Sequence, residues 1–246
     1  MTTFTAYPPH QINSLRDKLK ASLGSCALYE QAAQKFSEAL YQEFSPSVVL
    51  ARVYVSIPFA QLPTANKTFV NNLAAGKGVG NLITETTPIL SLAGTAGQKP
   101  AWMDRRKSQG HVGIPLCSAS FVDAIPMMSR LLQELGLNLA WFDKQDLSVV
   151  EKTAGGLAGL FYVAQAAQAT DAHGRKIIAA QDFVSANGIQ TVFGMGTSYV
   201  GGKFAVSIVF TTETIDRDQL RPIATLISTF KAETSRLAIA NAWMTA

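Results

Sequence analysis

The sharpest pattern in this sequence is a pair of apolar stretches near its C-terminal end. Residues 189–195 and 203–211 are rich in β-branched and apolar side chains, and a glycine-containing stretch, 196–202, separates them. Two such runs joined by a glycine-containing connection are typical of a β-hairpin. The pattern therefore predicts two antiparallel strands in this part of the chain.

Further elements follow from the spacing of apolar residues. Alternating or β-branched runs predict strands over 48–59, 88–93 and 157–164. Helical spacing predicts helices over 10–23, 28–44, 119–135, 178–187 and 220–237. Pro126 implies a kink or a late start in the helix over 119–135. This order predicts an α+β fold, an α/β sandwich with a central antiparallel sheet and the terminal helices packed on one face.

Length and composition are those of a globular protein. The chain has 246 residues, of which 48% are hydrophobic and 15% are charged, and this balance excludes disorder. No internal repeat or linker divides it. We therefore expect an N-terminal helical extension over residues 1–24 and a single domain over residues 25–246.

The net charge and the number of cysteines indicate which binding partners and which cellular compartment to expect. The net charge is only +4, and the basic stretch 105–107 follows Asp104 and lacks aromatic neighbours at stacking positions, so we expect no nucleic-acid binding. Cys26 and Cys117 are too few for a disulfide framework. The sequence contains no signal-peptide pattern and no run of roughly twenty apolar residues, so it predicts a cytoplasmic protein without a membrane partner.

Two blocks of sequence carry a resemblance to a known family. IAAQDFVSANGIQTVFGMG at 178–196 and GKFAVSIVF at 202–210 form one block, and LAGTAG at 92–97 with PAWMDRRKSQGHVGIPL at 100–116 forms the other. Both resemble a GAF-like sensor domain of the kind found ahead of bacterial histidine kinases and other signalling outputs. The resemblance covers about residues 25 to 240.

The sequence departs from the family pattern at Met103, where Asn is usual, and it ends at Ala246 without an output domain. The resemblance implies a GAF/PAS-like fold and a sensory, ligand-binding role in signal transduction. It names neither the small molecule nor a cofactor, and the signalling partner is likewise unknown.

Polar candidates gather in the second block. They are Trp102, Asp104, Arg105, Arg106, Ser108 and His111. Two arginines beside a carboxylate are suited either to holding an anionic ligand or to an internal ion-pair network that fixes the loop, and the sequence leaves both open.

We expect a small-molecule pocket between the sheet, the 100–116 loop and the helix that follows. An apolar pocket with a few convergent polar groups is typical of ligand sites. The predicted apolar lining is Trp102, Phe161, Tyr162 and Phe193, and the predicted polar contacts are Asp104, Arg105, Arg106 and His111.

Catalysis is not expected. No G-x-S-x-G elbow, phosphate-binding loop or cysteine–histidine pair is present, so we predict no catalytic residue and no enzyme. His111 has no second ligand at metal spacing, so no metal site is predicted. A haem-based sensor that uses His111 is an open alternative.

The last helix suggests a second alternative, a homodimer through the terminal helices that acts as an interaction module without a ligand. Its apolar stripe resembles heptad positions and consists of Leu220, Ile223, Ile227, Phe230, Thr234 and Leu237. The same stripe equally fits a helix that covers the sheet of its own chain.

Overall fold

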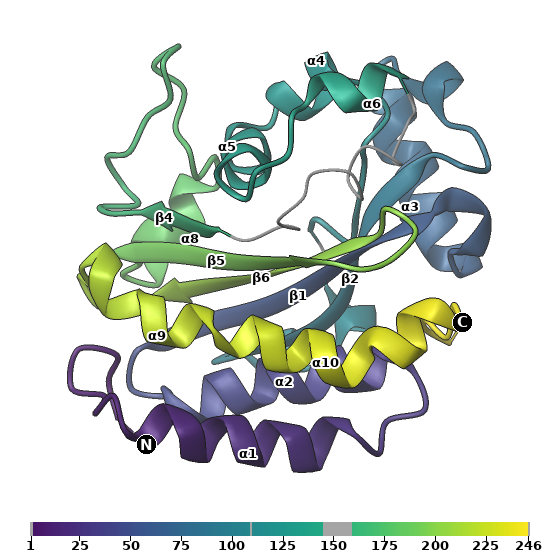
Figure 1. Cartoon of the computed structure of the whole chain (residues 1–246). Helices are drawn as coiled ribbons and strands as arrows, with labels where there is room; N and C mark the ends of the chain where they lie inside the picture. The colour runs from purple at the N-terminus through teal and green to yellow at the C-terminus, as the bar shows by residue number, and fades with distance from the viewer. Residues whose placement is uncertain (1, 109, 145–158, 246) are drawn as a thin grey trace.

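A six-stranded antiparallel sheet organises the residues that this computed structural model describes, which are 2–108, 110–144 and 159–245. The strands are β1 (Val48–Pro58), β2 (Pro88–Gly97), β3 (Gly113–Pro115), β4 (Leu160–Val163), β5 (Thr191–Ser198) and β6 (Phe204–Thr211). Their order across the sheet is β3-β2-β1-β6-β5-β4 (Figure 1). The central pair, β1 and β6, therefore joins the two halves of the chain.

Strands β5 and β6 form the hairpin that the sequence predicts. Their pairing runs from Thr191 opposite Thr211 to Ser198 opposite Phe204. Strand β1 pairs with β6 and with β2, and its register with β2 shifts between Val53 and Tyr54. Because successive side chains of a strand point to opposite faces, the sheet separates two apolar cores, one on each face.

Three helices cover one face of the sheet: α1 (Gln11–Leu23), α2 (Tyr29–Glu43) and α10 (Leu226–Ile239) (Figure 1). Leu15, Phe36 and Phe230 from these helices belong to one core with side chains of β1 and β5. The helix within residues 1–24 therefore shares the core of the following residues. The short helix α9 (Arg221–Ala224) precedes α10.

The apolar stripe of the last helix is buried within the chain. Each of its six members is at most 7% exposed, and the polar member, Thr234, donates its hydroxyl to the carbonyl of Phe230 at 2.6 Å. The stripe therefore covers the sheet of its own chain, which is one of the two interpretations that the sequence left open. A homodimer would have to use other surfaces.

Short helices cover the opposite face: α4 (Ala119–Asp123), α5 (Pro126–Glu134), α6 (Ala140–Lys144) and α8 (Gln181–Ala186) (Figure 1). Helix α3 (Thr64–Gly76) contacts the edge strand β3. The helix predicted over 119–135 is divided into two helices at Pro126, where the sequence predicts a kink or a late start. Pro126 cannot donate the hydrogen bond that a continuous helix requires, and it begins α5 instead.

The 100–116 stretch is more ordered than the predicted loop. It contains two 3₁₀ turns, Pro100–Trp102 and Arg105–Lys107, and ends in strand β3. The further 3₁₀ turns are Phe59–Gln61, Gly80–Leu82 and Arg217–Leu220. The predicted fold class is confirmed: the sheet is antiparallel, and the terminal helices lie together on one face.

Candidate functional site

A pocket of about 170 Å³ lies on the face of the sheet opposite the terminal helices. Its floor is formed by alternate residues of β1, which are Leu50, Arg52 and Tyr54. Ile208 and Phe210 of β6 pair with Arg52 and Leu50, respectively, and extend the same floor. The two-residue repeat of a strand places all five side chains on one face.

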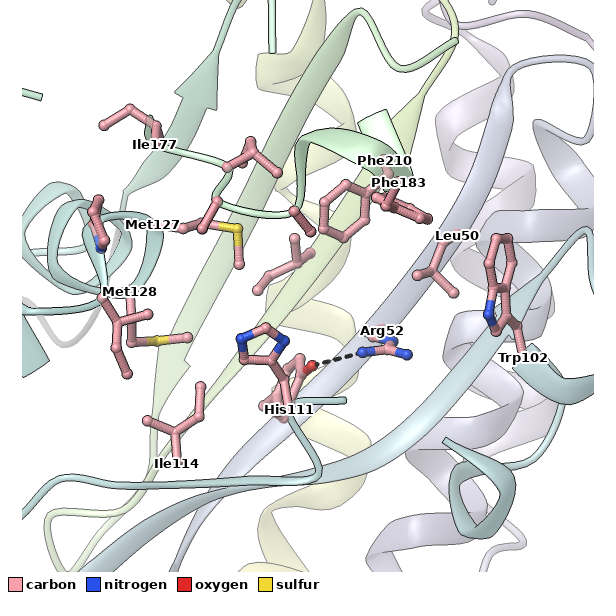
Figure 2. Close-up of a pocket in the computed structure, with 17 residues that line it drawn as sticks. Leu50, Arg52, Trp102, His111, Ile114, Met127, Met128, Ile177, Phe183 and Phe210 are labelled. Carbon is pink, nitrogen blue, oxygen red and sulfur yellow. Dashed lines mark hydrogen bonds between the residues drawn. The ribbon is translucent and has the colours of Figure 1, made fainter. Parts of the chain in front are cut away.

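Helix α5 and the segment before α8 cover this floor. Because Pro126 begins α5 at the edge of the pocket, Met127 and Met128 in its first turn line the cavity. Residues 177–180 and Phe183 close another side, and the ring of Phe183 meets that of Phe210 edge-on at 5.3 Å. The lining is therefore mainly apolar and comes from segments far apart in the sequence (Figure 2).

The 100–116 stretch supplies two side chains of the pocket, Trp102 and His111. The Trp102 ring meets Phe183 at 5.7 Å, and the Trp102 carbonyl accepts a hydrogen bond from the Thr95 hydroxyl at 3.0 Å. His111 has a left-handed backbone with a φ of 53°, which is uncommon for a side chain with a Cβ.

One charged side chain, Arg52, lines the pocket together with His111 (Figure 2). Its guanidinium donates to the Tyr54 hydroxyl at 3.3 Å, the Gly110 carbonyl at 3.2 Å and the Ser108 hydroxyl at 2.9 Å. Its Nε is buried and has no hydrogen-bond partner. All three acceptors are neutral oxygens.

The surroundings of His111 lower its pKa, which favours the neutral form of the ring. It keeps contact with solvent, but the surrounding atoms desolvate its ring and the positive charge of Arg52 repels a second cation, so that both effects lower the pKa of His111. A neutral imidazole offers one N–H donor and one nitrogen acceptor.

Asp104, Arg105 and Arg106 lie away from this pocket, in a separate and more open groove beside α2. Arg105 is 7% exposed, and it pairs with Glu30 at 2.5 Å and donates to the Thr245 carbonyl at 2.9 Å. Asp104 accepts from the backbone N–H and the Nε of Arg106 at 3.0 and 3.1 Å, and these bonds lower its pKa. These contacts favour the internal ion-pair network, and a ligand role for the three residues stays a prediction.

The other predicted aromatic residues also lie outside the pocket lining. Phe161 is fully buried on the same side of the sheet as the pocket. Tyr162 and Phe193 point toward the terminal helices, where the Tyr162 hydroxyl donates to the Ile215 carbonyl at 2.7 Å and Phe193 meets Phe4 at 5.3 Å. The structure thus brings together only Trp102 and His111 of the eight predicted residues.

Sequence reasoning missed Arg52. The signal was present, because Arg52 is the one charged residue in the apolar strand VVLARVYV, and a charge in a buried strand is unusual without a partner. The covering residues, Met127, Met128 and 177–180, carry no comparable signal, since apolar side chains there fit a core equally well.

No protein-family model matches the chain, and no curated protein matches its sequence. Among the solved structures similar to it is the phycoerythrobilin-bound GAF domain from a cyanobacterial phytochrome. The two share 9% sequence identity and a TM-score of 0.49, over 94% of this chain and 97% of that chain.

The chain has an antiparallel sheet with the terminal helices on one face and shorter helices on the other, which is the arrangement expected from the resemblance of its two sequence blocks. Among the residues that the structure describes, no helix has the length and apolar character needed to cross a membrane.

Proposed function

We propose that this chain is a non-catalytic sensory module of bacterial signal transduction, acting in the cytoplasm, that binds a small molecule in the pocket between β1, β6, α5 and α8. The observation that carries the proposal is the pocket itself, a mainly apolar cavity of about 170 Å³ lined by side chains from both halves of the chain. An apolar cavity of about 150 Å³ is large enough for benzene, so a ligand with one small ring matches this volume.

The loop that lines the pocket also contacts the C-terminal segment, which supports a sensory role. Trp102 and His111 line the cavity, and between them Arg105 donates to the carbonyl of Thr245, beyond the last helix. Glu30 accepts from the Thr245 N–H at 2.9 Å and binds the same arginine. A ligand that moves this loop would therefore change the contacts of Glu30 and Thr245, which lie outside the pocket.

The open groove beside α2 is a weaker candidate for the ligand site. Its charged side chains include Glu30, Arg105, Asp104 and Arg106, and these four form two ion pairs with one another. Because the charges already satisfy one another, a ligand there would have to displace contacts within the protein.

Two measurements test the pocket. Native mass spectrometry of freshly purified protein would detect a co-purified small molecule together with the assembly state. Benzene, added to protein with ¹³C-labelled methionine methyl groups, should shift the NMR signals of Met127 and Met128, which line the pocket. Met195, buried on the opposite face of the sheet, is the internal control.

A pair of variants at one position sharpens the test. Ile208→Phe extends the floor into the cavity and should abolish the benzene response, whereas Ile208→Val leaves more space and should retain it. The proposal is overturned if no small molecule co-purifies and benzene leaves Met127 and Met128 unchanged. Titration with haemin tests the His111 alternative, since a Soret band would indicate haem binding.

A further inference from the structure

Arg52 has an unusual environment for a charged side chain. It lies in β1, the third strand from the edge of the six-stranded sheet, and its neighbours Ala51 and Val53 are fully buried. Its three hydrogen bonds go to neutral oxygens of Tyr54, Ser108 and Gly110. No carboxylate of the described residues forms an ion pair with it.

The donors of Arg52 are not used up. A guanidinium has five N–H groups, whereas the described residues accept three hydrogen bonds from it. The unused donors include the buried Nε. A buried donor without an acceptor is costly, and this applies to the Nε, although Arg52 as a whole is only half-buried. By contrast, the buried Arg105 is neutralised by Glu30.

We propose that the ligand of this pocket is a small carboxylic acid whose apolar body fills the cavity and whose carboxylate pairs with Arg52. This inference rests on the proposed function and adds the chemical class of the ligand. The fork of a guanidinium matches the two oxygens of a carboxylate. In the view of Figure 2, Arg52 and His111 lie on one side of the cavity, and Met127, Ile177 and Phe183 lie on another.

The charge balance favours a carboxylate over a phosphate. Arg52 is the one side chain with a permanent positive charge among the lining residues described by the structure, and it lowers the pKa of His111, which disfavours a second positive charge there. A carboxylate brings one negative charge, which Arg52 neutralises. A phosphate monoester brings about −1.5 to −2 charges, part of which would stay unpaired in a mainly apolar site.

The volume sets the size of the acid. About 170 Å³ suits a single ring or a short branched chain with its carboxylate, given that about 150 Å³ takes up benzene. Benzoate is therefore the probe, benzamide is its neutral counterpart of the same shape, and benzene reports on the cavity alone.

Affinities of the three probes are measured by calorimetry or by NMR titration of the Met127 and Met128 methyl groups. We expect benzoate to bind the wild-type protein at least tenfold more tightly than benzamide does, which corresponds to about 1.4 kcal/mol. Arg52→Met keeps the apolar stem and removes the charge, so it should abolish this preference and leave benzene binding in place. Arg16→Met, on helix α1 of the opposite face, should preserve the preference.

The outcomes separate the two proposals. If benzene binds but benzoate is no tighter than benzamide in the wild-type protein, the carboxylate inference is wrong and the pocket proposal stands. If none of the three probes shifts Met127 or Met128, the carboxylate inference is wrong, and the pocket proposal is wrong as well if no small molecule co-purifies. The wild-type comparison needs no variant, so it decides the matter even if Arg52→Met fails to fold; a preference that survives in folded Arg52→Met also overturns the inference.

Discussion

Neighbouring arginines in the Arg105–Lys107 turn offer a direct test of structural against ligand-binding roles. The Arg105 side chain is 8% exposed and meets Glu30, which is 16% exposed, whereas the Arg106 side chain is 66% exposed. Arg105 also holds the Thr245 carbonyl at 2.9 Å. We therefore expect Arg105→Ala to destabilise the fold and Arg106→Ala to leave its stability nearly unchanged.

The expected magnitude follows from the burial of the pair. Removing one partner of a buried ion pair leaves the other charge uncompensated and costs about 3 kcal/mol or somewhat more. For a chain of this size, 1 kcal/mol corresponds to about 2–4 °C in Tm, so Arg105→Ala should lower Tm by roughly 6–12 °C. An exposed pair such as that of Arg106 with Asp104 contributes about 0–1 kcal/mol.

Urea unfolding of the single variants and of the double variant Arg105→Ala/Glu30→Ala completes the test. Because the two side chains contact each other, the double variant should be more stable than the sum of the single losses predicts, by about 1–2 kcal/mol. Additive losses, or an Arg105→Ala protein as stable as Arg106→Ala, would refute the ion-pair argument. Loss of ligand uptake at unchanged stability would instead favour the ligand role predicted from the sequence.

Two further predictions concern stability. Burial raises the pKa of Glu213, but hydrogen bonds from Ser47, Thr5 and Phe4 lower it more, to below its ordinary value of 4.5. The contribution of Glu213 to the free energy of unfolding is therefore complete above pH 4.5. It is lost as the pH falls through the lower pKa of the folded state. Glu213→Gln should cost about 1–2 kcal/mol at neutral pH, with the difference from wild type shrinking in acid; a constant difference across a pH series of urea titrations would contradict this. A Cβ on Gly94 would lie 2.2 Å from the carbonyl carbon of Ala33, so Gly94→Ala should separate β2 from α2 and cost about 3 kcal/mol or more, whereas Gly76→Ala, with no atom within 4 Å of the added carbon, should be within about 0.5 kcal/mol of wild type.

Local patterns were sufficient to predict much of the fold. The hairpin of β5 and β6 and the central strand β1 follow from alternation over eight or more residues. The strand β3 was missed because it has only three residues, Gly113–Pro115. Its pairing with β2, which places Ile114 opposite Leu90, depends on a neighbour that periodicity does not reveal.

The candidate site was predicted less well than the fold. Trp102 and His111 were found because they stand out in a polar stretch, but Tyr162 and Phe193 point to the other face of the sheet. Facing is set by register, and a change of one residue moves a side chain from one core to the other. An aromatic residue in a strand therefore indicates burial without indicating which core.

By itself, the sequence determined most of the longer helices and strands and their order, because these depend on periodicities that each segment carries alone, and that order was enough to predict an antiparallel sheet. Only the tertiary structure decided that Arg105 meets Glu30 while Arg52 meets no carboxylate among the described residues. The sequence shows that an arginine, and therefore a positive charge, is present at each of these positions. Whether that charge is already neutralised depends on which distant segments fold against it.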